Sequence, residues 1–199
     1  MYMWNHEKED SIFGLQGDVQ HRNFDSGGDL EQLLIRGGLT IRPTPGGIKY
    51  TMGYAHITSG VFGPSDGKSR ENRIYQEALA NQVVGEKIFL THRFRLEQRW
   101  VDGQDFRGRF RYFLGLNYPF NQANLGQGAW YLSLYNELFI NLNKDIGVGR
   151  EVDYFDRNRA YAALGYSLSD SVRLQFGYMW QENRQRGKGQ LQFNLLHSI

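Results

Sequence analysis

Arginine and glutamate recur at alternate positions in several stretches of this 199-residue chain. Successive side chains of a β-strand point to opposite faces, so residues of one parity share a face. That face should gather the side chains of Arg93, Arg95, Glu97, Arg99, Arg107, Arg109, Arg111, Tyr135, Glu137, Arg157 and Arg159. Guanidinium groups form bidentate pairs with carboxylates, and rings of arginine line anion-selective pores. The spacing therefore predicts either a network of buried ion pairs or a path for anions.

The other residue types that could carry catalysis or bind metal show no suitable spacing. The five histidines lie outside any recognisable Ser–His–acid spacing; they are His6, His21, His56, His92 and His197. Cysteine is absent, which excludes thiolate zinc sites and cysteine nucleophiles. The acidic loop 143–156 lacks the alternating ligand positions of an EF-hand. We therefore expect no catalytic residue, no metal and no cofactor, and a net charge of +2 gives no reason to expect nucleic acid.

Ten segments with period-two alternation must position these side chains. They are residues 12–22, 32–42, 48–57, 71–83, 88–100, 106–118, 130–142, 157–168, 171–181 and 189–199, and only in 71–83 is the apolar parity undetermined. Strands of soluble proteins cluster near about 5–6 residues, whereas a tilted strand that crosses a bilayer needs about 9–11. The pattern predicts one domain over residues 1–199, an all-β, ten-stranded antiparallel transmembrane barrel (a meander), with residues 1–11 as an N-terminal tail.

Aromatic side chains stand at both ends of the apolar face. They are Tyr54, Trp100, Phe106, Tyr118, Trp130, Tyr166, Tyr178 and Trp180. A soluble antiparallel barrel alternates as well, but girdles of this kind are typical of the two membrane interfaces. Connections after the even-numbered segments are mostly tight and the others are longer, as in outer-membrane barrels. We expect a polar lumen, an apolar lipid-facing wall and both termini at the end with the tight turns.

Four stretches resemble a known family. They are THRFRLEQRW (91–100), FRYFLGLNYP (110–119), NELFINL (136–142) and FDRNRAYAALGY (155–166). The chain resembles, over nearly its whole length, bacterial outer-membrane proteins grouped as domain of unknown function 2490. The resemblance implies a β-barrel in the outer membrane of a Gram-negative bacterium and supplies no catalytic residues. The first ten residues lack an apolar signal region, as in a chain whose signal peptide has been removed.

These observations lead to a functional expectation with alternatives. We expect an outer-membrane protein whose lumen is closed by an Arg/Glu/Tyr network and whose loops are exposed at the surface. The alternatives are a narrow anion-selective pore or small-molecule transporter, and a lipid-modifying enzyme. Expected partners are outer-membrane lipid, lipopolysaccharide, whose phosphates the basic stretch 184–188 could meet, and the barrel-assembly machinery. The oligomeric state stays open.

Overall fold

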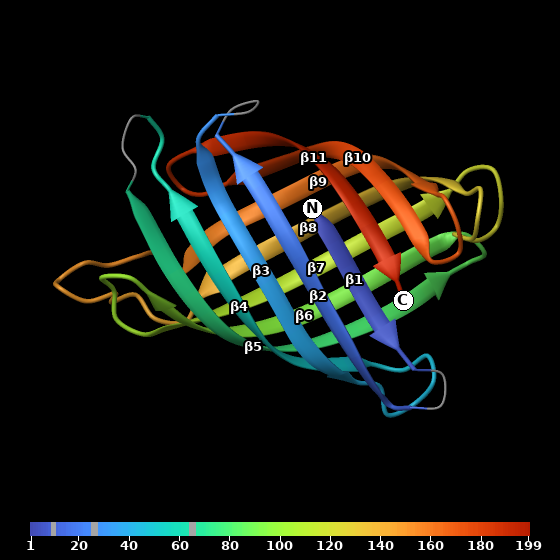
Figure 1. Cartoon of the computed structure of the whole chain (residues 1–199), viewed down its shortest axis with the longest axis horizontal. Helices are drawn as coiled ribbons and strands as arrows, with labels where there is room; N and C mark the ends of the chain where they lie inside the picture. The colour runs from blue at the N-terminus through green and yellow to red at the C-terminus, as the bar shows by residue number, and fades with distance from the viewer. Residues whose placement is uncertain (9–10, 25–27, 64–66) are drawn as a thin grey trace.

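Eleven β-strands form a closed barrel in the residues that the computed structural model describes, 1–8, 11–24, 28–63 and 67–199 (Figure 1). They are β1 (Tyr2–Glu7), β2 (Phe13–Asn23), β3 (Leu30–Ile41), β4 (Lys49–Gly60), β5 (Lys68–Val84), β6 (Ile88–Val101), β7 (Arg107–Pro119), β8 (Trp130–Asn141), β9 (Phe155–Ser167), β10 (Val172–Glu182) and β11 (Gly187–Ser198). Each strand pairs antiparallel with its neighbours in sequence, and β1 closes the barrel against β11. The predicted antiparallel all-β barrel is confirmed, but the predicted number of ten strands is wrong.

The additional strand is β1, which lies in the segment predicted to be an N-terminal tail. It pairs with β2 through Tyr2 and Val19, and with β11 through Tyr2 and Leu195. Its six residues are half-buried or exposed throughout, without alternation. Met3 stands between Tyr2 and Trp4, so the two parities of this short segment show no polar–apolar contrast. The other ten strands coincide with the ten predicted segments, apart from small shifts at their ends.

Because the number of strands is odd, the two termini lie at different levels along the barrel axis. Because antiparallel neighbours alternate in direction, β1 and β11 run the same way and pair in parallel. We define the turn end of the barrel by the connections 8–12, 42–48, 85–87, 120–129 and 168–171. β11 ends there, where Ser198 pairs with Asn5. Tyr2 pairs with Leu195, so β1 starts partway along the wall (Figure 1). The prediction that both termini lie at the turn end is therefore wrong for the N-terminus.

The opposite end of the barrel is the loop end, formed by connections 24–29, 61–67, 102–106, 142–154 and 183–186. Both ends are joined by strands of 11 to 17 residues from β2 to β11. The described residues contain no helix that is long and apolar enough to cross a membrane. The fold therefore consists of long strands and their connections.

The outer wall is apolar and the lumen is mainly polar. Leu132, Leu164, Phe176 and Phe193 of four successive strands are paired in register and form an apolar row on the outer wall. The side chains of Phe176 and Phe193 are 59% and 57% exposed. Charged side chains of the opposite parity are buried, next to two small apolar clusters built around Ile57 and Met179. This distribution is the reverse of that in a water-soluble barrel.

Glycine at one lumen position makes room for a tyrosine ring from the paired strand. Tyr131 pairs with Gly165, and a Cβ at Gly165 would overlap the Tyr131 ring. We expect Gly165→Ala to lower the free energy of unfolding by about 1–3 kcal/mol, because the ring must move within a packed lumen. Urea unfolding of the protein in phospholipid vesicles measures this.

The matched control is Gly37→Ala on the outer wall. There the nearest heavy atom to a new Cβ is Gln16 O at 4.0 Å. This variant should be as stable as the wild type or slightly more so, because alanine restricts the unfolded chain. Equal losses in both variants would contradict the lumen packing described for Gly165.

Candidate functional site

A connected set of ion pairs fills the lumen along β5 to β9. We call it the lumen network, and it consists of Glu71, Arg73, Glu77, Arg93, Arg95, Glu97, Arg99, Arg109, Arg111, Glu137, Asp156 and Arg157. The antiparallel registers place its members opposite one another, with Glu97 beside Arg109 and Arg95 beside Arg111. Seven guanidinium groups thus share five carboxylates, so the network carries excess positive charge.

Glu97 is the centre of the network. Its Oε2 accepts hydrogen bonds from Arg109 Nε and Nη2 at 2.9 and 2.6 Å. Its Oε1 accepts one from Arg111 Nη1 at 2.6 Å, and Arg73 Nη1 lies 3.8 Å away. Arg109 also donates from Nη1 to Asp156 Oδ2 at 2.7 Å. Oε2 of Glu97 therefore binds one arginine of β7, whereas Oε1 lies between arginines of β5 and β7.

Glu137 and Glu77 extend the network around the wall. Glu137 Oε1 accepts hydrogen bonds from Arg111 Nη2 and Arg93 Nη2, both at 2.6 Å. Arg93 Nε lies 3.6 Å from Glu77 Oε2, which also accepts a bond from Arg95 Nε at 2.7 Å. Arg93 of β6 contacts both Glu77 of β5 and Glu137 of β8, so it links two strands that are not neighbours.

Sequence analysis missed the contribution of β5, where it left the parity open. Glu71, Arg73, Tyr75 and Glu77 all point into the lumen and are buried. Glu71 pairs with Arg73 at 2.7 Å and also with Arg99. The short connection 85–87 could have revealed which residues of β5 face the lumen. A tight turn pairs Val84 with Ile88, so the known lumen-facing parity of β6 fixes that of β5.

Three predicted members lie in the lumen but outside these ion pairs. Arg107 is buried, and its Nε has no hydrogen-bond partner among the described residues. Arg159 Nε donates to Gln181 Oε1 at 2.8 Å. The ring of Tyr135 stacks on Tyr161, with centroids 4.7 Å apart. The other eight predicted residues are brought together by the structure.

Buried Phe139 stands among four guanidinium groups, those of Arg109, Arg111, Arg157 and Arg159, at 4.4 to 5.8 Å from its ring centroid. An aromatic face attracts cations, so this ring supports the positive side chains that carboxylates do not neutralise. On the opposite wall Asp18 pairs with Arg36, whose guanidinium lies 5.7 Å from the ring of Tyr75. The guanidinium of Arg95 lies 4.6 Å from the same ring, so Tyr75 contacts arginines of two strands.

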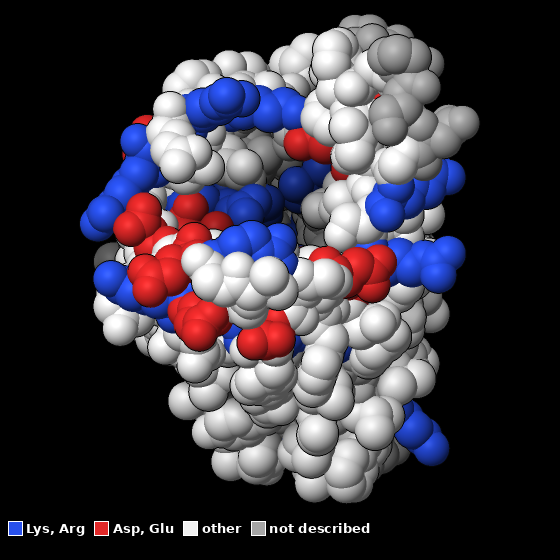
Figure 2. Space-filling view, turned by 90° about the vertical axis from the view of Figure 1, so that its left-hand side faces the viewer, with Lys and Arg blue, Asp and Glu red and all other residues white. Residues whose placement is uncertain are grey.

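The charged side chains at the centre of the lumen network are buried. Glu97 is 3% exposed, Arg109 2% and Glu137 4%. At the loop end the barrel is hollowed, and charged side chains of both signs surround the hollow and lie inside it (Figure 2).

The eight residues predicted as an aromatic girdle lie on the outer wall. Seven of them, all except half-buried Tyr166, are 40% to 52% exposed. Trp100 packs on Phe106 with ring centroids 5.4 Å apart, and Trp130 packs on Tyr166 at 4.7 Å. The first pair lies at the loop end of the barrel and the second pair lies at the turn end.

Three of the histidines contact side chains other than serine or carboxylate. His92 Nδ1 lies 2.9 Å from Tyr112 Oη, and His56 Nδ1 lies 2.9 Å from Asn72 Oδ1. His197 contacts Tyr2. In the described part of the chain no three His, Asp or Glu side chains are grouped as metal ligands. The connection 61–67 also contains a serine and an acid, Ser65 and Asp66, which lie outside the described residues.

Comparison with known proteins assigns the chain to a family without a known activity. No curated protein matches the sequence. The profile of a family described as "Protein of unknown function (DUF2490)" matches residues 3–192, which include the whole lumen network and ten strands from β2 onward in whole or part. Since the match spans most of the sequence and the fold is a β-barrel, the chain belongs to the DUF2490 family.

Proposed function

We propose that this chain is an integral barrel of the bacterial outer membrane whose lumen is closed by the lumen network. The observation that carries the proposal is the outer wall. Every strand from β2 to β11 presents at least one large apolar side chain that is 37% exposed or more. Soluble monomers rarely expose continuous apolar surface of this extent, whereas a lipid-facing wall requires it. The girdle aromatics at the ends of the wall support the same location.

The closed lumen is supported by the burial of its charges. An open pore would leave its lining arginines in contact with water, but Arg95, Arg109 and Glu97 are 2% to 3% exposed. Arg95 donates to Glu77 of β5, and Arg109 donates to Glu97 of β6, so these hydrogen bonds cross-link strands β5, β6 and β7. In this function the barrel acts as a rigid membrane-embedded support, and its loop end faces outward, towards lipopolysaccharide. The barrel-assembly machinery is its proposed partner during insertion.

A narrow anion path is the second candidate, because the lumen has more arginine than carboxylate. Arg107 and Arg159 have no carboxylate within 4 Å among the described residues. An anion could replace the missing carboxylates and move between the guanidinium groups. This candidate requires that the side chains around Glu97 move apart.

Membrane extraction and conductance together test the proposal. The chain, secreted in a Gram-negative host, should stay in the outer-membrane fraction after alkaline carbonate and be released by detergent. In planar bilayers the purified barrel should give no steady current, because packed ion pairs block the lumen. A porin in the same bilayer serves as the positive control.

Two results would contradict the proposal, each in a different part. A monodisperse chain without detergent would contradict the membrane location. An anion-selective current that Arg109→Glu abolishes would contradict the closed lumen and establish the second candidate.

A further inference from the structure

Three arginines form a row across neighbouring strands near the loop end of the lumen. Arg73 of β5 pairs in register with Arg99 of β6, and Arg99 pairs with Arg107 of β7. These three residues face the lumen and are 4% to 8% exposed. We call them the arginine row. Like charges on directly opposite residues destabilise a sheet, so the arginine row needs a counter-charge.

Glu71 is the carboxylate bound most directly to the arginine row. Its two oxygens accept hydrogen bonds from Arg73 Nε and Nη2 at 2.7 and 2.8 Å, and its Oε1 also accepts one from Arg99 Nε. Arg73 Nη1 lies 3.8 Å from Glu97, whose oxygens accept hydrogen bonds from arginines of β7. Three guanidinium groups thus share one carboxylate of their own, which leaves an excess of two positive charges.

Arg107 is the member of the arginine row that has no partner of its own. Its side chain makes no hydrogen bond and no ion pair with the described residues, and its Nε is buried. Arg99 Nη1 is also buried without a hydrogen-bond partner among those residues. An unpaired buried charge and an unsatisfied buried donor both cost free energy. The arginine row therefore offers charge and donors to a ligand that accepts hydrogen bonds.

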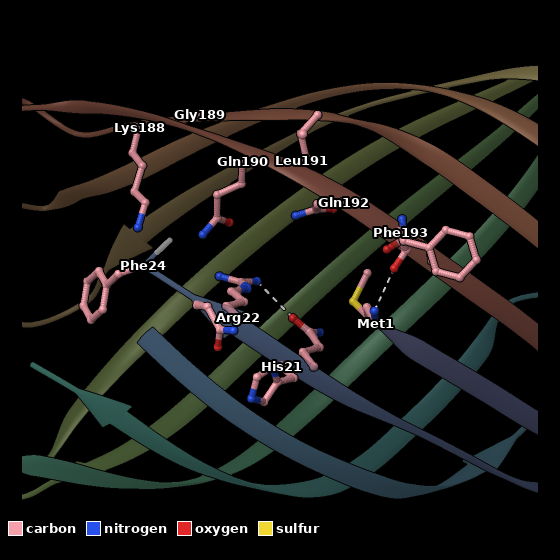
Figure 3. Close-up of a pocket in the computed structure, with 13 residues that line it drawn as sticks. Met1, His21, Arg22, Phe24, Lys188, Gly189, Gln190, Leu191, Gln192 and Phe193 are labelled. Atoms are coloured by element: carbon pink, nitrogen blue, oxygen red, sulfur yellow. Dashed lines mark hydrogen bonds between the residues drawn. The ribbon is translucent and has the colours of Figure 1, made fainter. Parts of the chain in front are cut away.

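Two other lumen arginines lack a carboxylate within 4 Å among the described residues, but each has an amide partner. Arg22 of β2 donates from Nη2 to Gln20 Oε1 at 3.0 Å (Figure 3). Arg159 of β9 donates from Nε to Gln181 Oε1 at 2.8 Å. No described side chain supplies such an oxygen to Arg107. The contrast singles out the arginine row as the place that needs an acceptor.

The arginine row lies on the loop-end side of the buried ion pairs around Glu97. Arg107 is the first residue of β7, and the pair of Arg99 and Arg107 lies two residues nearer the loop end than the pair of Glu97 and Arg109. The barrel is hollowed at this end, and Lys and Arg side chains lie inside the hollow (Figure 2). The row is therefore placed between the hollow and the centre of the lumen network.

We propose that the arginine row binds the phosphate group of a small soluble phosphate monoester that enters from the loop end. A phosphate monoester carries a charge of about −1.5 to −2 at pH 7 and has three acceptor oxygens. The charge matches the excess of the row, and the oxygens suit the planar forks of Arg99 and Arg107. A carboxylate matches less well, because it brings one charge and two oxygens.

A soluble ester is favoured over a membrane lipid because the arginine row faces the lumen and not the outer wall. In this arrangement the ester group extends from the row into the hollow, and the ion pairs around Glu97 stay closed behind it. The inference goes beyond the function proposed above and does not depend on the membrane location.

Isothermal titration calorimetry of the detergent-solubilised barrel tests the proposal. The probes are glycerol phosphate, inorganic phosphate, acetate and a short-chain phosphatidic acid. The wild type should bind glycerol phosphate and inorganic phosphate, and should bind acetate more weakly. Arg107→Gln should bind glycerol phosphate at least about tenfold more weakly, because charge-assisted hydrogen bonds are lost.

The matched control is Arg186→Gln, which removes an exposed cation from connection 183–186 at the same end of the barrel. This variant should bind glycerol phosphate like the wild type. Urea unfolding without phosphate adds a second measurement. There Arg107→Gln should be at least as stable as the wild type, because Arg107 has no described partner to lose. Glycerol phosphate should then stabilise the wild type and Arg186→Gln, but not Arg107→Gln.

Five results would overturn the proposal. They are no binding of either soluble phosphate, equal weakening in Arg107→Gln and Arg186→Gln, equally tight binding of acetate, binding of phosphatidic acid without glycerol phosphate, and a loss of stability in Arg107→Gln without phosphate. Failure of the proposed function shows separately, as a barrel that is monodisperse without detergent or as a steady current. The comparison of the two variants is valid in either case.

Discussion

Replacement of Glu97 with glutamine should lower the free energy of unfolding by about 3–5 kcal/mol, because it leaves buried arginines without their counter-charge. Glu97 accepts hydrogen bonds from Arg109 and Arg111 and is 3% exposed. The amide keeps the shape of the side chain, but it has only one oxygen acceptor and no charge. Urea unfolding of the barrel in phospholipid vesicles, followed by tryptophan fluorescence, measures the change.

The control for Glu97→Gln is Asp153→Asn at the loop end. Arg184 Nη1 lies 3.0 Å from Asp153 Oδ1, with side chains 66% and 49% exposed. Exposed pairs contribute little, so this variant should lose less than about 1 kcal/mol. If Glu97→Gln lost no more than the control, the lumen network would not hold the barrel together. Coupling between Glu97→Gln and Arg109→Gln in a double-mutant cycle would identify the pair responsible.

Replacement of Leu164 with arginine should destabilise the barrel in vesicles by about 2–4 kcal/mol, the cost of a cation on the lipid face near the middle of the bilayer. Leu164 is 49% exposed and stands between Leu132 and Phe176 in the apolar row of the outer wall. In the proposed membrane location, arginine at this position has only acyl chains around it. Folding titrations in vesicles measure the change.

The same substitution near the loop end provides a depth control. Leu142 is 51% exposed and follows β8 beside Gly108. Leu142→Arg should lose only about 0–1 kcal/mol, since its charge reaches the interface. A barrel that functions in water would tolerate both substitutions equally. Equal, small losses would therefore reject the lipid-facing wall.

Ten of the strands could be located from the sequence because their signal is local. A pleated strand repeats every two residues. The polar–apolar contrast along β6, β7 and β8 therefore indicates which face is turned to the lumen and which lies on the outer wall. β5 lacks this contrast, because polar Asn72 and Gln76 lie on its outer face. The correct parity there came from pairing with β6, which depends on a partner strand and not on the segment itself.

Closure of the barrel could not be predicted in the same way. β1 pairs with β11 through residues nearly the whole chain apart, such as Tyr2 and Leu195. Neither segment contains a local pattern that specifies the other.

The sequence by itself determined which side chains share the lumen, because the two-residue period of each strand assigns them to a face. The tertiary structure alone decided which charges meet. Arg109 lies between Glu97 of β6 and Asp156 of β9, and Arg111 lies between Glu97 and Glu137. Such contacts depend on strand register and on the closure of the barrel. Together these bring side chains of strands that are not paired with each other into contact. Parity is a property of one strand, whereas ion pairing depends on distances across the closed barrel.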